Sequence, residues 1–126
     1  NGVGLLDVRT EAGPTRLIGN VTASSDFGPL VGYENHSGLT YLGPDAAPLG
    51  RTALGRGNNG TDGTEGARRD NVIGTYLHGP LLASCPGVAD HLLAAALCAA
   101  GMARDLPPLD DRRAAAAARV AAARPR

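Results

Sequence analysis

Short apolar runs separated by glycine, proline and polar residues occupy the N-terminal two thirds of the chain. Runs of this length and spacing predict β-strands rather than long helices. The segments 51–56 and 64–68 are expected to pair as a hairpin, because turn-forming residues fill the stretch between them. The other strands are expected at 15–23, 30–34, 39–42 and 71–78, and 3–8 is expected to be a buried strand or a turn into one.

One helix is predicted after these strands. Pro86 and Gly87 precede Val88, Leu92, Leu93 and Leu97, which recur at helical spacing until Gly101. Beyond 107–108 the composition changes to almost only Asp, Arg and Ala, which favours helix but offers little to bury. We therefore divide the chain into a main unit, 1–104, and an exposed tail rich in Ala and Arg, 105–126.

This order of elements predicts an α/β layer protein, since a β-sandwich would not need the terminal helix. The chain has too few crossover helices to complete a parallel sheet. It begins at Asn1, inside an apolar run and without an initiator methionine. We therefore expect sequence upstream of Asn1 to be missing from this domain.

Composition narrows the function classes. Twelve basic residues balance twelve acidic ones, so charge gives no reason to expect a nucleic-acid partner. No apolar run approaches the roughly 20 residues that span a bilayer. Two cysteines, Cys85 and Cys98, are too few for a disulfide framework or a zinc site, and a reducing, cytoplasmic setting is the default.

Three segments carry more polar or glycine residues than packing requires. His78 follows an apolar run and precedes Gly-Pro, where it fits either a general base or a strand-end cap that bonds backbone. For the polar segment 32–38 we favour a turn in which side chains bond local backbone. The glycine-rich segment 55–66 lacks the Gly-Lys-Ser/Thr ending and the helix of a phosphate loop, so an ordered surface loop is expected.

A nucleophile for His78 is difficult to find in this sequence. Cys85 does not stand in a glycine-flanked strand-to-helix turn. Cys98 falls in the apolar helix, where a small buried role is expected. Ser37 is next to His36, but neighbouring side chains on a strand point to opposite faces.

Two ordered motifs resemble the cobyric-acid-synthase-like (CobB/CobQ-like) branch of class I glutamine amidotransferases. Residues 72–80, Val-Ile-Gly-Thr-Tyr-Leu-His-Gly-Pro, are similar to its histidine motif, and residues 32–40, Gly-Tyr-Glu-Asn-His-Ser-Gly-Leu-Thr, to its other signature. The sequence Glu-Asn-His is most similar to the glutaminase subunits of bacterial lipid II isoglutaminyl synthase, the GatD type. Residues 48–50 and the loop 57–66 resemble the same subunits. The resemblance covers about 1–101.

This resemblance implies the C-terminal part of a flavodoxin-like three-layer domain that carries the catalytic histidine, His78, without the nucleophilic cysteine. Arg16 is a candidate for binding the α-carboxylate of glutamine, or a solvated arginine. An acid found two residues after the histidine in many relatives is replaced here by Pro80. An orienting carboxylate would come from elsewhere in the domain, with Glu34 as the local candidate, or from the partner, or is absent.

The resemblance also implies partners. Glutamine is the substrate, and ammonia passes to a Mur-ligase-like (MurT-type) subunit that binds ATP and magnesium and handles the lipid II acceptor. No metal or organic cofactor is expected in the glutaminase subunit itself. Two alternatives remain: the amidotransferase part of a cobyric acid or cobyrinate amide synthase, and a catalytically dead scaffold for a ligase.

Overall fold

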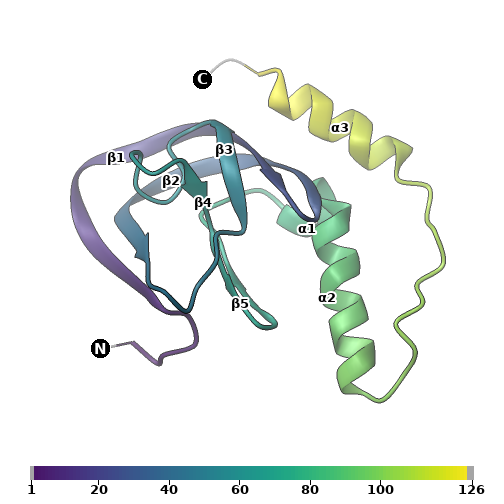
Figure 1. Ribbon diagram of the computed structural model, residues 1–126. Helices are drawn as coiled ribbons and strands as arrows, with labels where there is room; N and C mark the ends of the chain where they lie inside the picture. The colour runs from purple at the N-terminus through teal and green to yellow at the C-terminus, as the bar shows by residue number, and fades with distance from the viewer. Residues whose placement is uncertain (1, 125–126) are drawn as a thin grey trace.

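The computed structural model describes residues 2–124, which combine antiparallel β-sheets with helices (Figure 1). One sheet has four strands in the order β2-β1-β3-β4, and a second sheet pairs β5 with β6. The elements are β1 (Val8–Ser25), β2 (Gly28–Leu42), β3 (Gly50–Leu54), β4 (Thr64–Glu65), β5 (Ala67–Arg69), β6 (Val72–Gly74), α1 (Leu81–Ser84), α2 (Pro86–Ala99) and α3 (Arg112–Ala122).

The long hairpin of β1 and β2 dominates the structure and curves across Figure 1. Ser25 closes its turn, because its hydroxyl donates to the carbonyl of Gly28 over 2.7 Å and accepts from the N–H of Phe27 over 3.1 Å. The register shifts between Ala12 and Leu17, where Pro14 lacks an N–H for the ladder. The predicted strand 15–23 is therefore part of a longer one.

The polar turn expected at 32–38 is wrong. Strands predicted at 30–34 and 39–42 are one continuous strand, β2, in which Glu34 pairs with Gly19 and His36 with Leu17. Side chains alternate along it, so Glu34 and His36 are buried while Tyr33 and Ser37 are exposed. His36 does bond local backbone, the carbonyl of Gly38 at 2.8 Å, but the carboxylate of Glu34 is bonded by Arg56 and Gly57, outside the segment.

Of the two alternatives for 3–8, the turn into a strand is confirmed and the buried strand is wrong, because bends at residues 4–6 lead into β1, which begins at Val8. Val3 and Leu5 are 89% and 62% exposed. Residues 3–7 have apolar side chains but no strand partner within the described part of the chain.

The hairpin predicted between 51–56 and 64–68 is confirmed at its base, where Gly50 pairs with Glu65 and Arg51 with Thr64. Arg68 instead belongs to the second sheet and pairs with Ile73. The predicted strand 71–78 is shorter than expected: β6 ends at Gly74, and the next strand contact is a single bridge between His78 and Tyr33.

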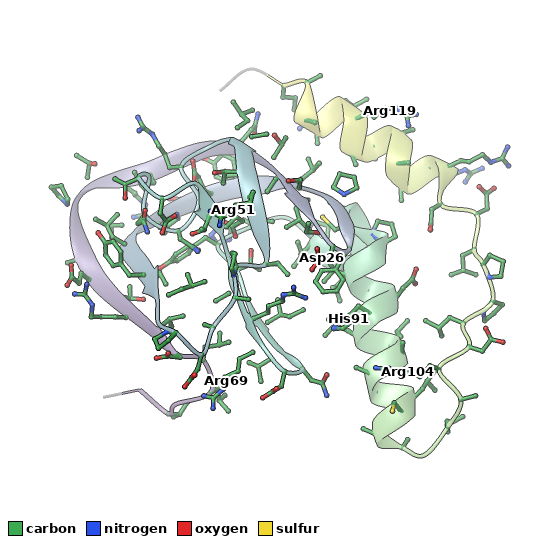
Figure 2. The ribbon with its side chains drawn as sticks, viewed as in Figure 1. Asp26, Arg51, Arg69, His91, Arg104 and Arg119 are labelled. Carbon is green, nitrogen blue, oxygen red and sulfur yellow. The ribbon has the colours of Figure 1, made fainter. Side chains whose placement is uncertain are left out.

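The predicted helix is confirmed as α2, with Pro86 in its first turn. It packs on a small aliphatic core formed by Val21, Ala23, Leu30, Leu49, Leu77, Cys85 and Val88. On the same side, Phe27 contacts the ring of His91 at a centroid distance of 4.5 Å, and Figure 2 labels Asp26 and His91 there. The β1–β2 turn is thereby attached to α2.

The tail contains α3, which has no buried residue. It lies near the hairpin in Figure 1, and the side-chain amide of Asn20 donates to the carbonyl of Arg124 over 2.9 Å. None of the helices within residues 2–124 has both the length and the apolar character needed to cross a bilayer.

Candidate functional site

His78 has a fixed backbone and an exposed side chain. It exchanges two hydrogen bonds with Tyr33, its N–H donating over 2.7 Å and its carbonyl accepting over 3.2 Å. Gly79 follows with φ +89°, a value that favours glycine, and the chain then turns into α1. Its imidazole makes no hydrogen bond to any group within residues 2–124, so it is available to a ligand.

Arg16 lies on the same face of the hairpin as His78. Directly bridged residues of antiparallel strands project to one side, which places His78 with Tyr33. Asn35 is two residues along β2 and shares that side, about 7 Å further on. Its side-chain carbonyl accepts from Nε of Arg16 over 2.5 Å. We call this surface the Tyr33 face; it contains Arg16, Tyr33, Asn35 and His78.

Glu34 lies on the opposite face of β2, away from His78. It is fully buried, and its carboxylate accepts three backbone contacts from Arg56 and Gly57, at 2.9–3.1 Å. Nε2 of His36 lies 3.9 Å from its Oε2. The structure therefore does not bring this candidate orienting carboxylate to His78.

A second buried carboxylate, Glu65, does reach the segment that leads to His78. Its Oε1 accepts from the hydroxyl of Thr75 over 2.6 Å and from the N–H of Tyr76 over 3.1 Å. The ring of Tyr76 stacks on His36 at a centroid distance of 3.6 Å. Sequence reasoning missed Glu65; a glutamate between Thr64 and Gly66 in a polar loop carries no local signal of burial.

Two atoms in this buried cluster lack a hydrogen-bond partner among the described residues: Nε2 of His36 and Oε2 of Glu65. Burial raises the pKa of Glu65, although the hydrogen bonds from Thr75 and Tyr76 and the nearby His36 act in the opposite direction. Oε2 and Nε2 therefore form the least satisfied part of an otherwise bonded network.

The glycine-rich segment is a loop, as expected, but residues 57–59 and 64–66 are buried, so it is not a surface loop throughout. Asn58 is 1% exposed, and its side chain donates to the hydroxyl of Thr64 over 2.9 Å and the carbonyl of Gly66 over 2.8 Å. Gly57 has φ +61°, and a Cβ there would lie 2.1 Å from the carbonyl oxygen of Thr64, so only glycine fits. Asn59 and Glu65 of the same loop bond residues outside it, Thr40 and the Thr75–Tyr76 segment.

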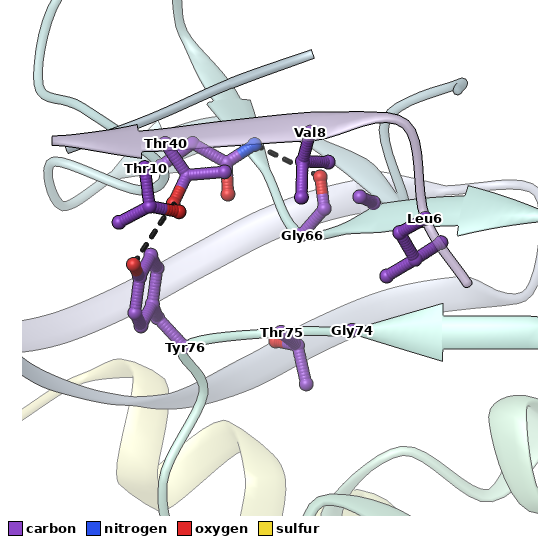
Figure 3. A pocket seen from close by; sticks show the side chains of 10 residues that line it. Leu6, Val8, Thr10, Thr40, Gly66, Gly74, Thr75 and Tyr76 are labelled. Atoms are coloured by element: carbon purple, nitrogen blue, oxygen red, sulfur yellow. Dashed lines mark hydrogen bonds between the residues drawn. The ribbon is translucent and has the colours of Figure 1, made fainter. Parts of the chain in front are cut away.

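Beside this loop is a cavity of about 170 Å³, shown in Figure 3. Leu6, Val8 and Tyr76 line it, and the hydroxyl of Tyr76 hydrogen bonds to that of Thr40 over 2.9 Å. It lies on the buried side of the hairpin, whereas His78 is exposed on the Tyr33 face.

Cys85 is unsuited to act as the nucleophile. It is 2% exposed, and its sulfur contacts the backbone N–H and carbonyl of Val31 at 3.4 and 3.8 Å. Burial raises the pKa of its thiol, although the contact with Val31 lowers it, whereas an activated cysteine needs a lowered one. Cys98 is exposed on α2, not buried as predicted, because it lies on the solvent side of the helix.

The hydrogen bonds that the Glu34 carboxylate accepts predict that this residue stabilises the fold. In Glu34→Gln, one oxygen acceptor becomes an N–H₂ group that faces backbone N–H donors. We expect the free energy of unfolding to fall by about 1–3 kcal/mol, measured by urea titration. Glu11→Gln, at an exposed residue, is the control and should change it by less than about 0.5 kcal/mol. Equal stability of both variants would contradict this assignment.

The raised pKa of Glu65 predicts a pH-dependent stability. A carboxyl whose folded pKa lies above its ordinary 4.5 stabilises the fold at low pH, and this contribution is lost as pH rises through the folded pKa. Glu65→Gln should therefore gain stability relative to the unsubstituted protein as pH rises above the ordinary value of 4.5. Urea titrations at a series of pH values measure it. A difference that is flat with pH, as expected for Glu11→Gln, would refute it.

Comparison with known proteins agrees with the family resemblance of the motifs at 32–40 and 72–80. Residues 1–85 match the family model of the CobB/CobQ-like glutamine amidotransferase domain. Over 93 residues the chain is 46% identical to the GatD subunit of lipid II isoglutaminyl synthase (glutamine-hydrolyzing) from Staphylococcus aureus, covering 73% of this chain and 37% of that protein. The corresponding Streptococcus pneumoniae subunit is 40% identical over 84 residues, covering 65% of this chain and 32% of that protein.

A cobyric acid synthase from Sphingopyxis alaskensis is 43% identical over 104 residues, which is 82% of this chain and 20% of that protein. The chain thus spans little more than a third, or less, of the length of these relatives. Because the family model matches residues 1–85, well over half of the chain, the chain belongs to the family of CobB/CobQ-like glutamine amidotransferase domains.

Proposed function

We propose that the protein containing this chain is a glutaminase, in which His78 carries protons during release of ammonia from glutamine. The observation that carries the proposal is the exposed imidazole of His78, held by its backbone to Tyr33 and free of hydrogen bonds to other described groups. An imidazole fixed in place and open to a ligand can take and return a proton near neutral pH.

In this mechanism the thiolate comes from a cysteine outside residues 1–126, because Cys85 is buried with a raised pKa and Cys98 lies at the far end of α2. The thiolate attacks the side-chain amide carbon of glutamine, and protonated His78 gives its proton to the departing ammonia. A water molecule, deprotonated by His78, then cleaves the thioester and releases glutamate. The flavodoxin-like three-layer domain that we expect would bring this cysteine to the Tyr33 face.

Arg16 is suited to bind the α-carboxylate of glutamine. Only its Nε has a hydrogen-bond partner among the described residues, the side chain of Asn35. The two terminal nitrogens therefore remain available, and a guanidinium fork binds carboxylates well. Arg16 and His78 are on the same face, as a substrate with an α-carboxylate at one end and an amide at the other requires.

The similarity to the GatD subunits of two bacteria supports a role in cell-wall synthesis. In this proposal the ammonia amidates the D-glutamate of the lipid II stem peptide, on a MurT-type ligase partner that binds ATP and magnesium, in the cytoplasm. The similarity to cobyric acid synthase supports a second candidate, amidation of a cobyrinic acid derivative. Supplying each acceptor to the purified full-length protein with its ligase, and measuring the amide formed, separates the two.

We predict that His78→Ala in the full-length protein lowers ammonia release from glutamine by about 10²–10⁴-fold, the usual contribution of a general acid and base. Ammonia is measured by coupling to glutamate dehydrogenase. His91→Ala is the control, because His91 lies on α2 against Phe27 and not on the Tyr33 face. Retention of near-normal activity by His78→Ala would remove the residue from the mechanism and favour the scaffold alternative.

For Arg16 we predict an effect on substrate binding. Arg16→Gln removes the charged fork, so KM for glutamine should rise about 10- to 100-fold, consistent with the 1.5–3 kcal/mol of a hydrogen bond to a charged group, and kcat should change less. Arg9→Gln on the same strand is the control, because Arg9 pairs with Glu11 at the surface. If both variants have the KM of the unsubstituted protein, Arg16 is a solvated surface residue.

A further inference from the structure

Glu65 contacts the backbone that leads to His78. Its Oε1 holds the Thr75 hydroxyl at 2.6 Å and the Tyr76 N–H at 3.1 Å, three and two residues before His78. The same Thr75 hydroxyl accepts from the N–H of Leu77 over 3.0 Å. The carboxyl group is thus connected to three consecutive residues that end next to the histidine.

No sheet supports this stretch of chain. β6 ends at Gly74, and the next strand contact in the described structure is the bridge between His78 and Tyr33. The intervening residues 75–77 are held by the Glu65 hydrogen bonds and by side-chain contacts, because Tyr76 stacks on His36 and bonds Thr40 and Leu77 lies in the core. Removal of Glu65 leaves these side-chain contacts but takes away the acceptor that fixes the Thr75 hydroxyl and the Tyr76 N–H.

Glu65 is itself rigidly placed. It is fully buried, and its backbone pairs with Gly50 in the four-stranded sheet. Gly66 follows with φ +64°, and a Cβ there would lie 2.7 Å from the carbonyl oxygen of Gly74. This close approach brings the two chain segments together and sets the reach of the Glu65 side chain.

We propose that Glu65 is a positioning residue for His78, which acts by accepting the hydrogen bonds of Thr75 and Tyr76 and so fixes the path of the chain into the catalytic histidine. This inference rests on the proposed role of His78 in glutamine hydrolysis. Both the carboxylate and the carboxylic acid can accept through Oε1, so the role requires an oxygen acceptor and not a negative charge.

The acceptor requirement distinguishes two substitutions. Glutamine keeps a side-chain carbonyl oxygen for Thr75 and Tyr76, and its N–H₂ group replaces the oxygen that has no partner, Oε2. Alanine removes the acceptor and leaves the Tyr76 N–H without it. Thr75→Val tests the same contact from the other side with a side chain of similar shape.

The experiment measures kcat, KM for glutamine and the thermal midpoint in the full-length protein. For Glu65→Ala we expect a loss of about 10- to 100-fold in kcat per folded molecule, since a displacement near 1 Å can cost about 100-fold, with KM changed less than about threefold. Glu65→Gln should stay within about threefold of normal kcat, and Thr75→Val should fall between the two.

The matched control is Asn58→Ala. Asn58 is equally buried in the same loop and bonds Thr64 and Gly66, but it has no bond to Thr75 or Tyr76. This variant should lower the thermal midpoint while its folded molecules retain kcat. A residue with a merely structural role would behave like Asn58 and would not show rescue by glutamine.

Normal kcat in folded Glu65→Ala, or an equal loss in Asn58→Ala, would overturn the proposal. An equal loss of kcat in Glu65→Gln and Glu65→Ala would also overturn it, because the negative charge and not the oxygen acceptor would then be required. If Glu65→Ala does not fold, Thr75→Val with normal kcat overturns it alone. The parallel His78→Ala assay separates the proposed function from the positioning role. Full activity of His78→Ala refutes the proposed function. A loss of activity in His78→Ala with normal kcat in Glu65→Ala refutes only the positioning role.

Discussion

The register of β1 against β2 is the constraint on which the candidate site depends. Asn20 pairs with Tyr33 and Gly19 with Glu34, so adjacent β2 side chains are assigned to opposite faces. A slip of one residue would exchange these faces. It would expose Glu34 and remove its carboxylate from the backbone donors of the loop, and it would bury Tyr33, whose backbone holds His78. The same pairing thus separates the buried polar network from the exposed histidine.

Buried carboxyl groups join separate segments of this chain by hydrogen bonds, which adds to a small hydrophobic core. The core cluster is mainly Val, Leu and Ala, with Phe27 only at its edge. Glu34 joins β2 to the loop at Arg56 and Gly57, and Glu65 joins that loop to the segment before His78. A buried carboxyl group is costly unless hydrogen bonded, so each one strongly favours a single arrangement of its partners.

How far the sequence predicts the structure depends on where the partners lie. The helix over 86–99 and the base of the hairpin at Arg51 and Thr64 follow from local periodicity and turn residues. The alternation argument also placed His36 and Ser37 on opposite faces, and their burial agrees. The turn expected at 32–38 failed because the groups that bond Glu34 lie more than twenty residues away in the loop. No local pattern reveals such distant partners.

The same limit applies to the candidate site. His78 could be selected from its place before Gly-Pro and from its motif, but Glu65 could not, since its link to Thr75 and Tyr76 exists only in the folded chain. A residue that carries protons must be held in place while its ring stays accessible. At His78 the backbone meets the first requirement through Tyr33, and exposure on the Tyr33 face meets the second. Backbone anchoring on one side of the strand, with the buried network behind it, leaves the imidazole free for a ligand.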